Sequence, residues 1–369
     1  MNAPPPPSVP VHVPTVRIGA LVPLSRPGWA EAGRHLLAGL ELGVGEINGS
    51  GGIGGTPLEL AVRDTAADPR RAEAAVEELD RLGVAAVAGE YHSVVARAAA
   101  TRADALGVPF LCSSAVLDTL TDRPSDHVAR LAPPQSRGWR LYADHLLDAG
   151  HRRIAVATQP SVYWESGTRV LREHLAPRGG TVLDLDTRAL TPGQVCDALA
   201  ERGATALLLL VGHPDPAVPL VQAVRRDRRL SGVLVGAPAG QPEFGEWAAL
   251  LGGDGAGVPF LRYLPERLTS LGERVAKALR ERLSAAPSFV AFEGYDTATV
   301  LAEVLRARGT EDRARIAEGW PRVETEGTRG PVRFSRTPGT NLWQWDAAPV
   351  QIVDRDPADP GSFRVLRSG

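Results

Sequence analysis

The sequence predicts an α/β protein of two lobes, each a mainly parallel sheet flanked by helices. Residues 16–64 read as strand, helix, glycine turn and strand: an apolar run of strand length, apolar residues at helical spacing, then strict alternation. This βαβ opening implies a parallel sheet. The pattern restarts after Pro133, and beyond Phe260 long helical stretches follow with no strand between them. The restart predicts a second α/β unit.

The first unit continues in short, well-marked elements. Asp68 is suited to cap a helix that begins at Pro69, and Gly83 ends it. The expected elements that follow are a strand over 84–88, a helix from Ser93 to about Leu106 and a strand over 108–112.

The second unit alternates in the same way. Its expected elements are helix 141–149, strand 154–158, a helix to about 175, strand 181–185, a helix from Thr191 and Pro192 to Gly203, and strand 206–211. Two later helices, about 265–283 and 292–306, have no strand of their own. They must therefore pack on a sheet that is already built.

Composition is that of a globular protein with no nucleic-acid or membrane role. The chain has 369 residues, enough for about two domains, and 43% of them are hydrophobic. A net charge of −2 argues against nucleic-acid binding, which needs a basic face. The arginines of 225–229 are expected to be a solvated helix end. No apolar run reaches the length of a membrane span, so we expect no direct membrane insertion.

The sequence lacks the residues that several classes of enzyme require. Lys277 is the only lysine and lies in an amphipathic helical stretch, which argues against Schiff-base and P-loop chemistry. Cys112 and Cys196 have no C-x-x-C spacing, so neither a zinc site nor a disulfide is expected. No G-x-S-x-G or H-E-x-x-H motif occurs. We expect no cofactor and no metal.

One nucleotide-binding motif occurs in the wrong context. Gly49, Gly51 and Gly54 satisfy G-x-G-x-x-G, but a helix precedes them and a strand follows. The dinucleotide motif requires the reverse order, so that a helix N-terminus meets the pyrophosphate.

The first fifteen residues predict a disordered, proline-rich tail. They contain six prolines and no run of signal-peptide length. The sequence as it stands therefore predicts a cytoplasmic location, with export as the alternative if the native N-terminus is longer.

Five segments carry a family resemblance. They are IGALVPLS (18–25) with the glycine turn and strand of 48–64, residues 89–115, residues 162–186, FEGYDTATVLAEVL (292–305) and GPVRF (330–334). In this order the set resembles the type I periplasmic-binding-protein family, the branched-chain amino acid and amide receptors. Residues 162–186, Tyr91 and Ser93 are most similar to the amide- and urea-binding branch, which includes a cytosolic amide sensor.

The resemblance implies the type I, two-lobed periplasmic-binding-protein-like fold with three hinge crossings. The helices after Phe260 would return to the first lobe, and the tail from about 330 would finish on the second. The predicted lobes are 15–132 plus 262–328, and 133–261 plus 329–369.

Candidate ligand contacts lie at strand ends, because open parallel sheets bind ligands beyond the carboxyl ends of their strands. Tyr91 and Ser93 follow one strand, and Ser113, Ser114 and Ala115 follow the next. Ser93 could bond a ligand carbonyl or carboxylate, and the family has a ligand-contacting serine here. The alternative is a plain N-cap serine. Tyr91 either contacts the ligand or packs as a rim aromatic.

The second lobe supplies the opposite wall. Tyr163 and Trp164 precede a helix where the family has an aromatic contact, and His213 lies in the loop after Val211. Trp29 follows the first strand and is placed to close the cleft.

Two departures from the family narrow the ligand class. Amino-acid-binding members have a threonine where this chain has Val116, and an acidic residue in the loop that here reads Ala237, Pro238, Ala239; Glu243 comes several residues later. A buried ammonium without a counter-charge costs several kcal/mol. A neutral amide, urea-like or other small polar ligand is favoured over a plain branched-chain amino acid.

These observations predict a non-catalytic receptor that closes on a small polar ligand, whether an amide, urea-like or amino-acid-derived. It would act as a cytosolic sensor with a regulatory partner protein, or as an ABC-transporter substrate-binding protein with a permease. The alternative is an enzyme recruited from the same scaffold, for which His213 with Asp215 is the only acid/base material.

Overall fold

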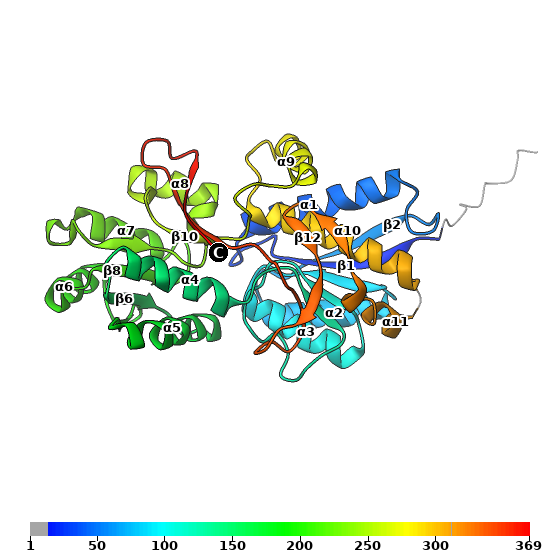
Figure 1. The fold of residues 1–369 in the computed structure, drawn as a ribbon, viewed down its shortest axis with the longest axis horizontal. Helices are drawn as coiled ribbons and strands as arrows, with labels where there is room; N and C mark the ends of the chain where they lie inside the picture. The colour runs from blue at the N-terminus through cyan, green and yellow to red at the C-terminus, as the bar shows by residue number, and fades with distance from the viewer. Residues whose placement is uncertain (1–13, 311) are drawn as a thin grey trace, which may run out of the picture.

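The computed structural model describes residues 14–310 and 312–369, and these form two lobes side by side (Figure 1). The predicted tail of residues 1–15 falls outside the described residues, apart from its last two. No helix in the described ranges is both long and apolar enough to cross a bilayer.

The first lobe is built on a seven-stranded sheet in the order β13-β14-β5-β4-β3-β1-β2. All neighbours pair in parallel except the antiparallel pair β13–β14. The strands are β1 (Val16–Val22), β2 (Leu58–Asp64), β3 (Ala86–Gly89), β4 (Phe110–Cys112), β5 (Val128–Arg130), β13 (Phe334–Arg336) and β14 (Trp343–Trp345).

Helices cover both faces of this sheet. Ile18 and Ala20 of β1 face the core under α1 (Ala30–Gly49) and α10 (Phe289–Arg308), whereas Leu21 faces α2 (Pro69–Arg81) and α3 (Ser93–Leu106). Helix α9 (Ser270–Leu283) packs on α1, and α11 (Arg313–Ala317) on α10. Of the helices after Phe260, α10 therefore packs on the first sheet, and α9 and α11 are attached to it through α1 and α10.

Two glycines let α1 and α10 touch backbone to backbone. A Cβ on Gly39 would lie 1.9 Å from the carbonyl oxygen of Ala291, and one on Gly294 would lie 2.2 Å from that of Leu36. No other residue type fits at such a distance, so these glycines fix how closely the two helices approach.

The second lobe has a four-stranded parallel sheet in the order β7-β6-β8-β9. Its strands are β6 (Arg153–Thr158), β7 (Thr181–Asp186), β8 (Ala206–Leu210) and β9 (Leu234–Gly236), and its helices are α4 (Gln135–Asp148), α5 (Val162–Leu175), α6 (Pro192–Arg202), α7 (Ala217–Arg226) and α8 (Gly245–Leu251). Single 3-10 turns are η1 (Ala176–Arg178), η2 (Arg228–Leu230), η3 (Gln241–Glu243), η4 (Gly252–Gly255) and, in the first lobe, η5 (Trp320–Arg322).

Two small antiparallel sheets complete the fold. One joins β10 (Phe260–Arg262) to β15 (Gln351–Arg355) and β16 (Phe363–Ser368), and the other is the pair β11 (Thr325–Gly327) and β12 (Gly330–Val332).

The expectation that the whole tail from 329 finishes on the second lobe is wrong for 334–345. Strands β13 and β14 extend the first sheet, because β14 pairs with β5 and its buried Gln344 ties the two together. Gln344 accepts a hydrogen bond from Arg130 Nε and donates one to the carbonyl of Ala132. Of the other strands after 329, β12 pairs with β11, and β15 and β16 form a sheet with β10, so all three lie outside the first sheet. The other lobe boundaries stay a prediction.

Most predicted elements are present, with shifted ends. The predicted helix 141–149 begins earlier, at Gln135, because Pro134 is extended and starts it. The helix expected from 265 begins at Ser270, where Thr269 caps it by accepting from the Gly272 amide.

Candidate functional site

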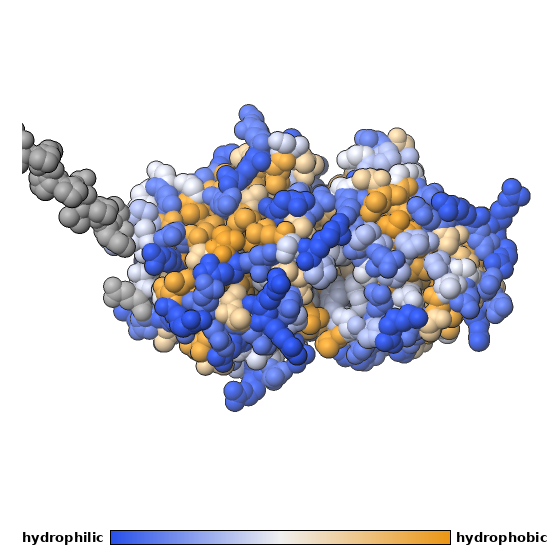
Figure 2. Space-filling view, turned by 180° about the vertical axis from the view of Figure 1, so that it is seen from behind, coloured by the Kyte–Doolittle hydropathy of each residue, from blue (hydrophilic) through white to orange (hydrophobic). Residues whose placement is uncertain are grey.

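A cavity of about 330 Å³ lies between the lobes, and both contribute to its wall. The space-filling view shows a furrow between the lobes on the outer surface (Figure 2). The first-lobe side is lined by Pro27, Trp29, Ala67, Pro69, residues 91–95, Ser114, Val116 and Phe289, and the second-lobe side by Ser161, Tyr163, Trp164, Val211, Gly212 and Ala239, with Tyr263 between them.

Six of the nine predicted contact residues line this cavity: Trp29, Tyr91, Ser93, Ser114, Tyr163 and Trp164. The other three lie behind the wall. The Ser113 hydroxyl bonds Thr297 Oγ1 at 3.0 Å, and Ala115 is fully buried in the core. His213 packs between the rings of Trp29 and Trp247.

Ser93 has one hydrogen-bonding valence free for a ligand. It is the first residue of α3, and its oxygen accepts from the backbone amides of Val116 and Leu117 at 3.1 and 3.3 Å. The hydroxyl proton remains to be donated. The α3 residues that follow, Val94 and Val95, also line the cavity, so the amide-rich end of this helix faces it.

His92 is held in a fixed orientation beside Ser93. The Trp29 amide donates to its Nε2 at 3.4 Å, and its Nδ1 lies 3.2 Å from Glu90 Oε1. The same Glu90 oxygen accepts from the His92 amide. These bonds fix the loop that leads from β3 into the cavity.

Aromatic rings from both lobes meet at one end of the cavity. Trp29 and Tyr91 of the first lobe lie 5.6 Å apart, and both contact Phe244 of the second lobe at 5.7 and 6.0 Å between ring centroids. Burial raises the pKa of Tyr91, Tyr163 and Tyr263 above the ordinary value. Their phenols therefore stay protonated and can donate or accept.

No Asp, Glu, Lys or Arg side chain occurs among the described residues that line the cavity. Ala239 lies in the wall, in the loop that the sequence showed to lack a carboxylate. Glu243 is buried but paired: Arg262 Nε lies 2.9 Å from its Oε2, and the Phe289 amide donates to its Oε1. No group of three or more potential metal ligands occurs in residues 14–310 and 312–369.

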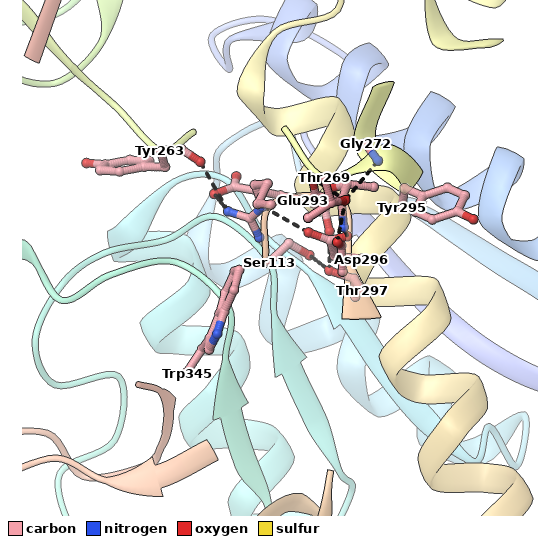
Figure 3. A network of polar contacts seen from close by, with 12 residues as sticks. Ser113, Tyr263, Thr269, Gly272, Glu293, Tyr295, Asp296, Thr297 and Trp345 are labelled. Atoms are coloured by element: carbon pink, nitrogen blue, oxygen red, sulfur yellow. Dashed lines mark hydrogen bonds and ion pairs between the residues drawn. The ribbon is translucent and has the colours of Figure 1, made fainter. Parts of the chain in front are cut away.

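Sequence reasoning missed Glu293, a fully buried carboxyl on α10. Arg329 Nη1 lies 3.2 Å from its Oε1, and the same guanidinium donates to Asp296 and to the carbonyl of Tyr263 (Figure 3). Burial raises the pKa of Glu293 to about 8, although Arg329 opposes the shift. A signal was present: most residues around Glu293 on α10 are apolar or small, which is typical of a buried helix.

The lobes also touch outside the cavity. The carboxylate of Glu31 on α1 accepts from the amides of Gly245 and Glu246, at 2.8 and 3.2 Å, and so caps α8 of the second lobe. Arg26 pairs with Glu246 at 2.5 Å. These contacts hold the two lobes together in the arrangement seen here.

The comparisons with known proteins agree with this architecture. A family model described as periplasmic binding protein matches residues 15–355. The chain belongs to the periplasmic binding protein family. Its fold, a two-lobed arrangement of sheets flanked by helices, is confirmed by the solved structures that it resembles.

Three relatives illustrate the match. The Leu/Ile/Val-binding protein homolog 7 of Brucella abortus is 30% identical over 56% of this chain and 55% of its own length. The leucine-binding protein LivK of Thermotoga maritima superposes with a TM-score of 0.80 at 19% identity, over 96% of this chain and 98% of that one. An R. palustris ABC-transporter solute-binding protein in complex with benzoate gives 0.79 at 18%, over 96% of each. The chain thus aligns with about half the length of the curated relative.

Proposed function

We propose that this protein is a non-catalytic receptor that closes its two lobes on one small, uncharged polar molecule of the amide or urea-like class. The observation that carries the proposal is the cavity wall, which combines aromatic rings and hydroxyls from both lobes and has no Asp, Glu, Lys or Arg side chain among the residues that the structure describes. The volume of about 330 Å³ is at the lower end for small-molecule sites, which span about 300–1,000 Å³.

The wall favours an uncharged ligand over a zwitterion. Burying an ammonium or a carboxylate without a counter-charge costs several kcal/mol. The wall does offer hydrogen bonds to neutral groups, from Ser93, Ser161 and the phenols of Tyr91, Tyr163 and Tyr263. Aromatic faces are suited to a planar molecule, and a carboxamide group is planar.

Closure follows from the division of the wall between the lobes. Ser93 and Ser114 belong to the first lobe, and Tyr163 and Trp164 to the second. Only an arrangement that brings both sets together makes every contact, so the ligand shifts the population toward the closed form.

In this proposal, the partner protein that recognises the closed form is an ABC-transporter permease. Support comes from the named neighbours, one a solute-binding protein of an ABC transporter. A cytosolic regulatory partner is the alternative. Fractionation of the native host with an antibody distinguishes them, because a receptor for a permease is recovered outside the cytoplasm and a sensor inside it.

The ligand class is tested by thermal shift with a panel of amides, ureas, amino acids and short or aromatic acids. A ligand present at 100 times its Kd stabilises the folded state by about 2.7 kcal/mol. We expect uncharged amides or ureas to raise Tm most. Stabilisation by leucine, valine or benzoate alone would contradict the proposal.

The same incubations test reception without chemistry. His213, the base that the sequence suggested, does not line the cavity. We expect chromatography to recover the bound compound unchanged.

A further inference from the structure

Two serines at neighbouring strand ends have opposite hydrogen-bonding needs. Ser93, after β3, already accepts two amide protons and has only its own proton to offer. Ser114, after β4, is almost fully buried, and its Oγ has no hydrogen-bond partner among the described residues. Both line the cavity.

The neighbour of Ser114 is Glu293, whose carboxyl also lacks, among the residues described, a hydrogen-bond partner on one oxygen. The Ser114 hydroxyl lies close enough to Glu293 to favour its charged form, yet no hydrogen bond of good geometry joins them, and Glu293 Oε2 lacks a partner within the described chain. An unpaired buried polar group is costly, so groups of this kind are normally satisfied by a neighbour, water or ligand.

The surrounding charges explain why Glu293 is left incomplete. Arg329 is the one guanidinium that contacts both Glu293 and Asp296 (Figure 3). The Asp296 oxygens are each engaged, one by Arg329 Nε and one by the Thr328 amide at 2.7 Å. Among the described residues, the carboxyl oxygen of the cluster that lacks a hydrogen bond is therefore Oε2 of Glu293.

We propose that Glu293 and Ser114 are specificity-determining residues that recognise an N–H group of the ligand, while Ser93 donates to the carbonyl oxygen next to it. Above the pKa of Glu293, its carboxylate accepts a hydrogen bond from the Ser114 hydroxyl, which turns the lone pairs of Ser114 Oγ toward the cavity as an acceptor. A primary amide presents a carbonyl oxygen and an N–H side by side, and so complements both serines. An isosteric methyl ketone offers only the oxygen.

This inference rests on the proposed function and adds the residues that select the ligand. Its test is calorimetric titration of the full chain at pH 9, where Glu293 is ionised, with two isosteric pairs, benzamide with acetophenone and butyramide with 2-pentanone. A ketone leaves the buried Ser114 oxygen unpaired, which corresponds to about fivefold or more in affinity, so the wild type should prefer the amide of at least one pair by that factor.

Two variants should remove this preference, and a matched one should keep it. Ser114→Ala deletes the acceptor and replaces no residue of the ion cluster. Glu293→Gln keeps an oxygen for Arg329 and places an NH₂ group where Oε2 was, so Ser114 accepts from it and turns its proton toward the ligand. Ser113→Ala is the control, because its hydroxyl bonds Thr297 and lies outside the wall.

We expect the amide preference to fall below about threefold in Ser114→Ala and Glu293→Gln and to persist in Ser113→Ala. If Glu293→Gln fails to fold, Ser114→Ala decides. A wild-type ratio near one, or a ratio unchanged in the folded variants, overturns the inference and leaves the proposed receptor standing. If neither pair binds while leucine or benzoate does, the proposed function fails, and the inference with it.

Discussion

Two buried ion clusters of opposite composition lie near the junction of the lobes. In one, the carboxyls of Glu293 and Asp296 share the guanidinium of Arg329. In the other, the single carboxyl of Glu243 lies beside Arg262, with Arg355 bonded to the carbonyl of the same residue. Each arginine also stacks on an aromatic ring, Arg329 on Trp345 and the other two on Phe363.

The difference in composition indicates that the second cluster has a structural role, whereas the first has, within the described chain, an unpaired acceptor. In the second cluster Arg355 donates to the carbonyls of Pro242, Glu243, Phe244 and Pro360, so its extra cation is used to hold η3 against the C-terminal strands. In the first cluster Glu293 Oε2 lacks a hydrogen bond among the described residues, and its neighbour Ser114 lines the cavity, whereas Glu243 Oε2 of the second cluster lies 2.9 Å from Arg262 Nε. The two clusters are both buried but differ in role, because Glu293, the carboxyl with an incomplete set of partners, is the one placed for a ligand.

Removing the cation should distinguish the clusters most sharply. Arg329→Met leaves two buried carboxyls without a counter-charge, so the free energy of unfolding should fall by about 3–5 kcal/mol. Arg355→Met leaves Arg262 beside Glu243 and removes hydrogen bonds to neutral backbone carbonyls. The free energy of unfolding should therefore fall less, by about 1–3 kcal/mol. Urea denaturation measures both. The reverse order would show that the second cluster, not the first, depends on its charge balance.

The pH dependence of stability should carry the signature of Glu293. Its pKa rises from 4.5 to about 8 on folding, so between these values the folded state holds a proton that the unfolded state has released. Stability should therefore be greatest below pH 4.5 for this group and fall with rising pH, by up to about 1.4 kcal/mol per pH unit, until pH 8.

The groups that face Glu293 are Arg329, Asp296, Tyr91, Tyr263 and Glu243, and all remain in Glu293→Gln. The variant should lose this slope while other contributions persist. Denaturation of the ligand-free protein from pH 5 to 9 tests the difference, and parallel curves for the two proteins would contradict it.

Local sequence patterns predicted the residues of the cavity better than they predicted the two ion clusters. Strand and helix periods placed Tyr91, Ser93 and Ser114 at strand ends, and parallel sheets bring strand ends together, so these positions were predictable. Glu293 meets Arg329 across 36 residues of chain, and Glu243 meets Arg262 across 19. No periodicity encodes such pairs. The placement of β13 and β14 was missed for the same reason, since the residues that join β14 to β5, such as Gln344 and Arg130, are far apart in sequence.

Ser93→Ala should weaken ligand binding by about one hydrogen bond, or 0.5–1.5 kcal/mol. It should also lower Tm without ligand, because the amides of Val116 and Leu117 lose their acceptor. Ser114→Ala removes a hydroxyl whose oxygen has no hydrogen bond of good geometry in the described part of the ligand-free protein, so it should lower Tm less than Ser93→Ala does. Titration and thermal denaturation of both variants give the contrast, and an unchanged affinity in Ser93→Ala would remove that residue from the site.

The smallest expected effect concerns an ion contact at the surface. Glu31 caps α8 across the lobes, but it lies in contact with water, where charge–dipole interactions at a helix N-terminus are worth about 0.3–1 kcal/mol and are screened by salt. Glu31→Gln should therefore weaken ligand binding about twofold to fivefold at low ionic strength and scarcely at all in high salt. Because the contact joins the lobes instead of stabilising either one, the urea midpoint should hardly move. Titration at two salt concentrations tests this, and a loss independent of salt would mean that Glu31 acts through packing and not through its charge.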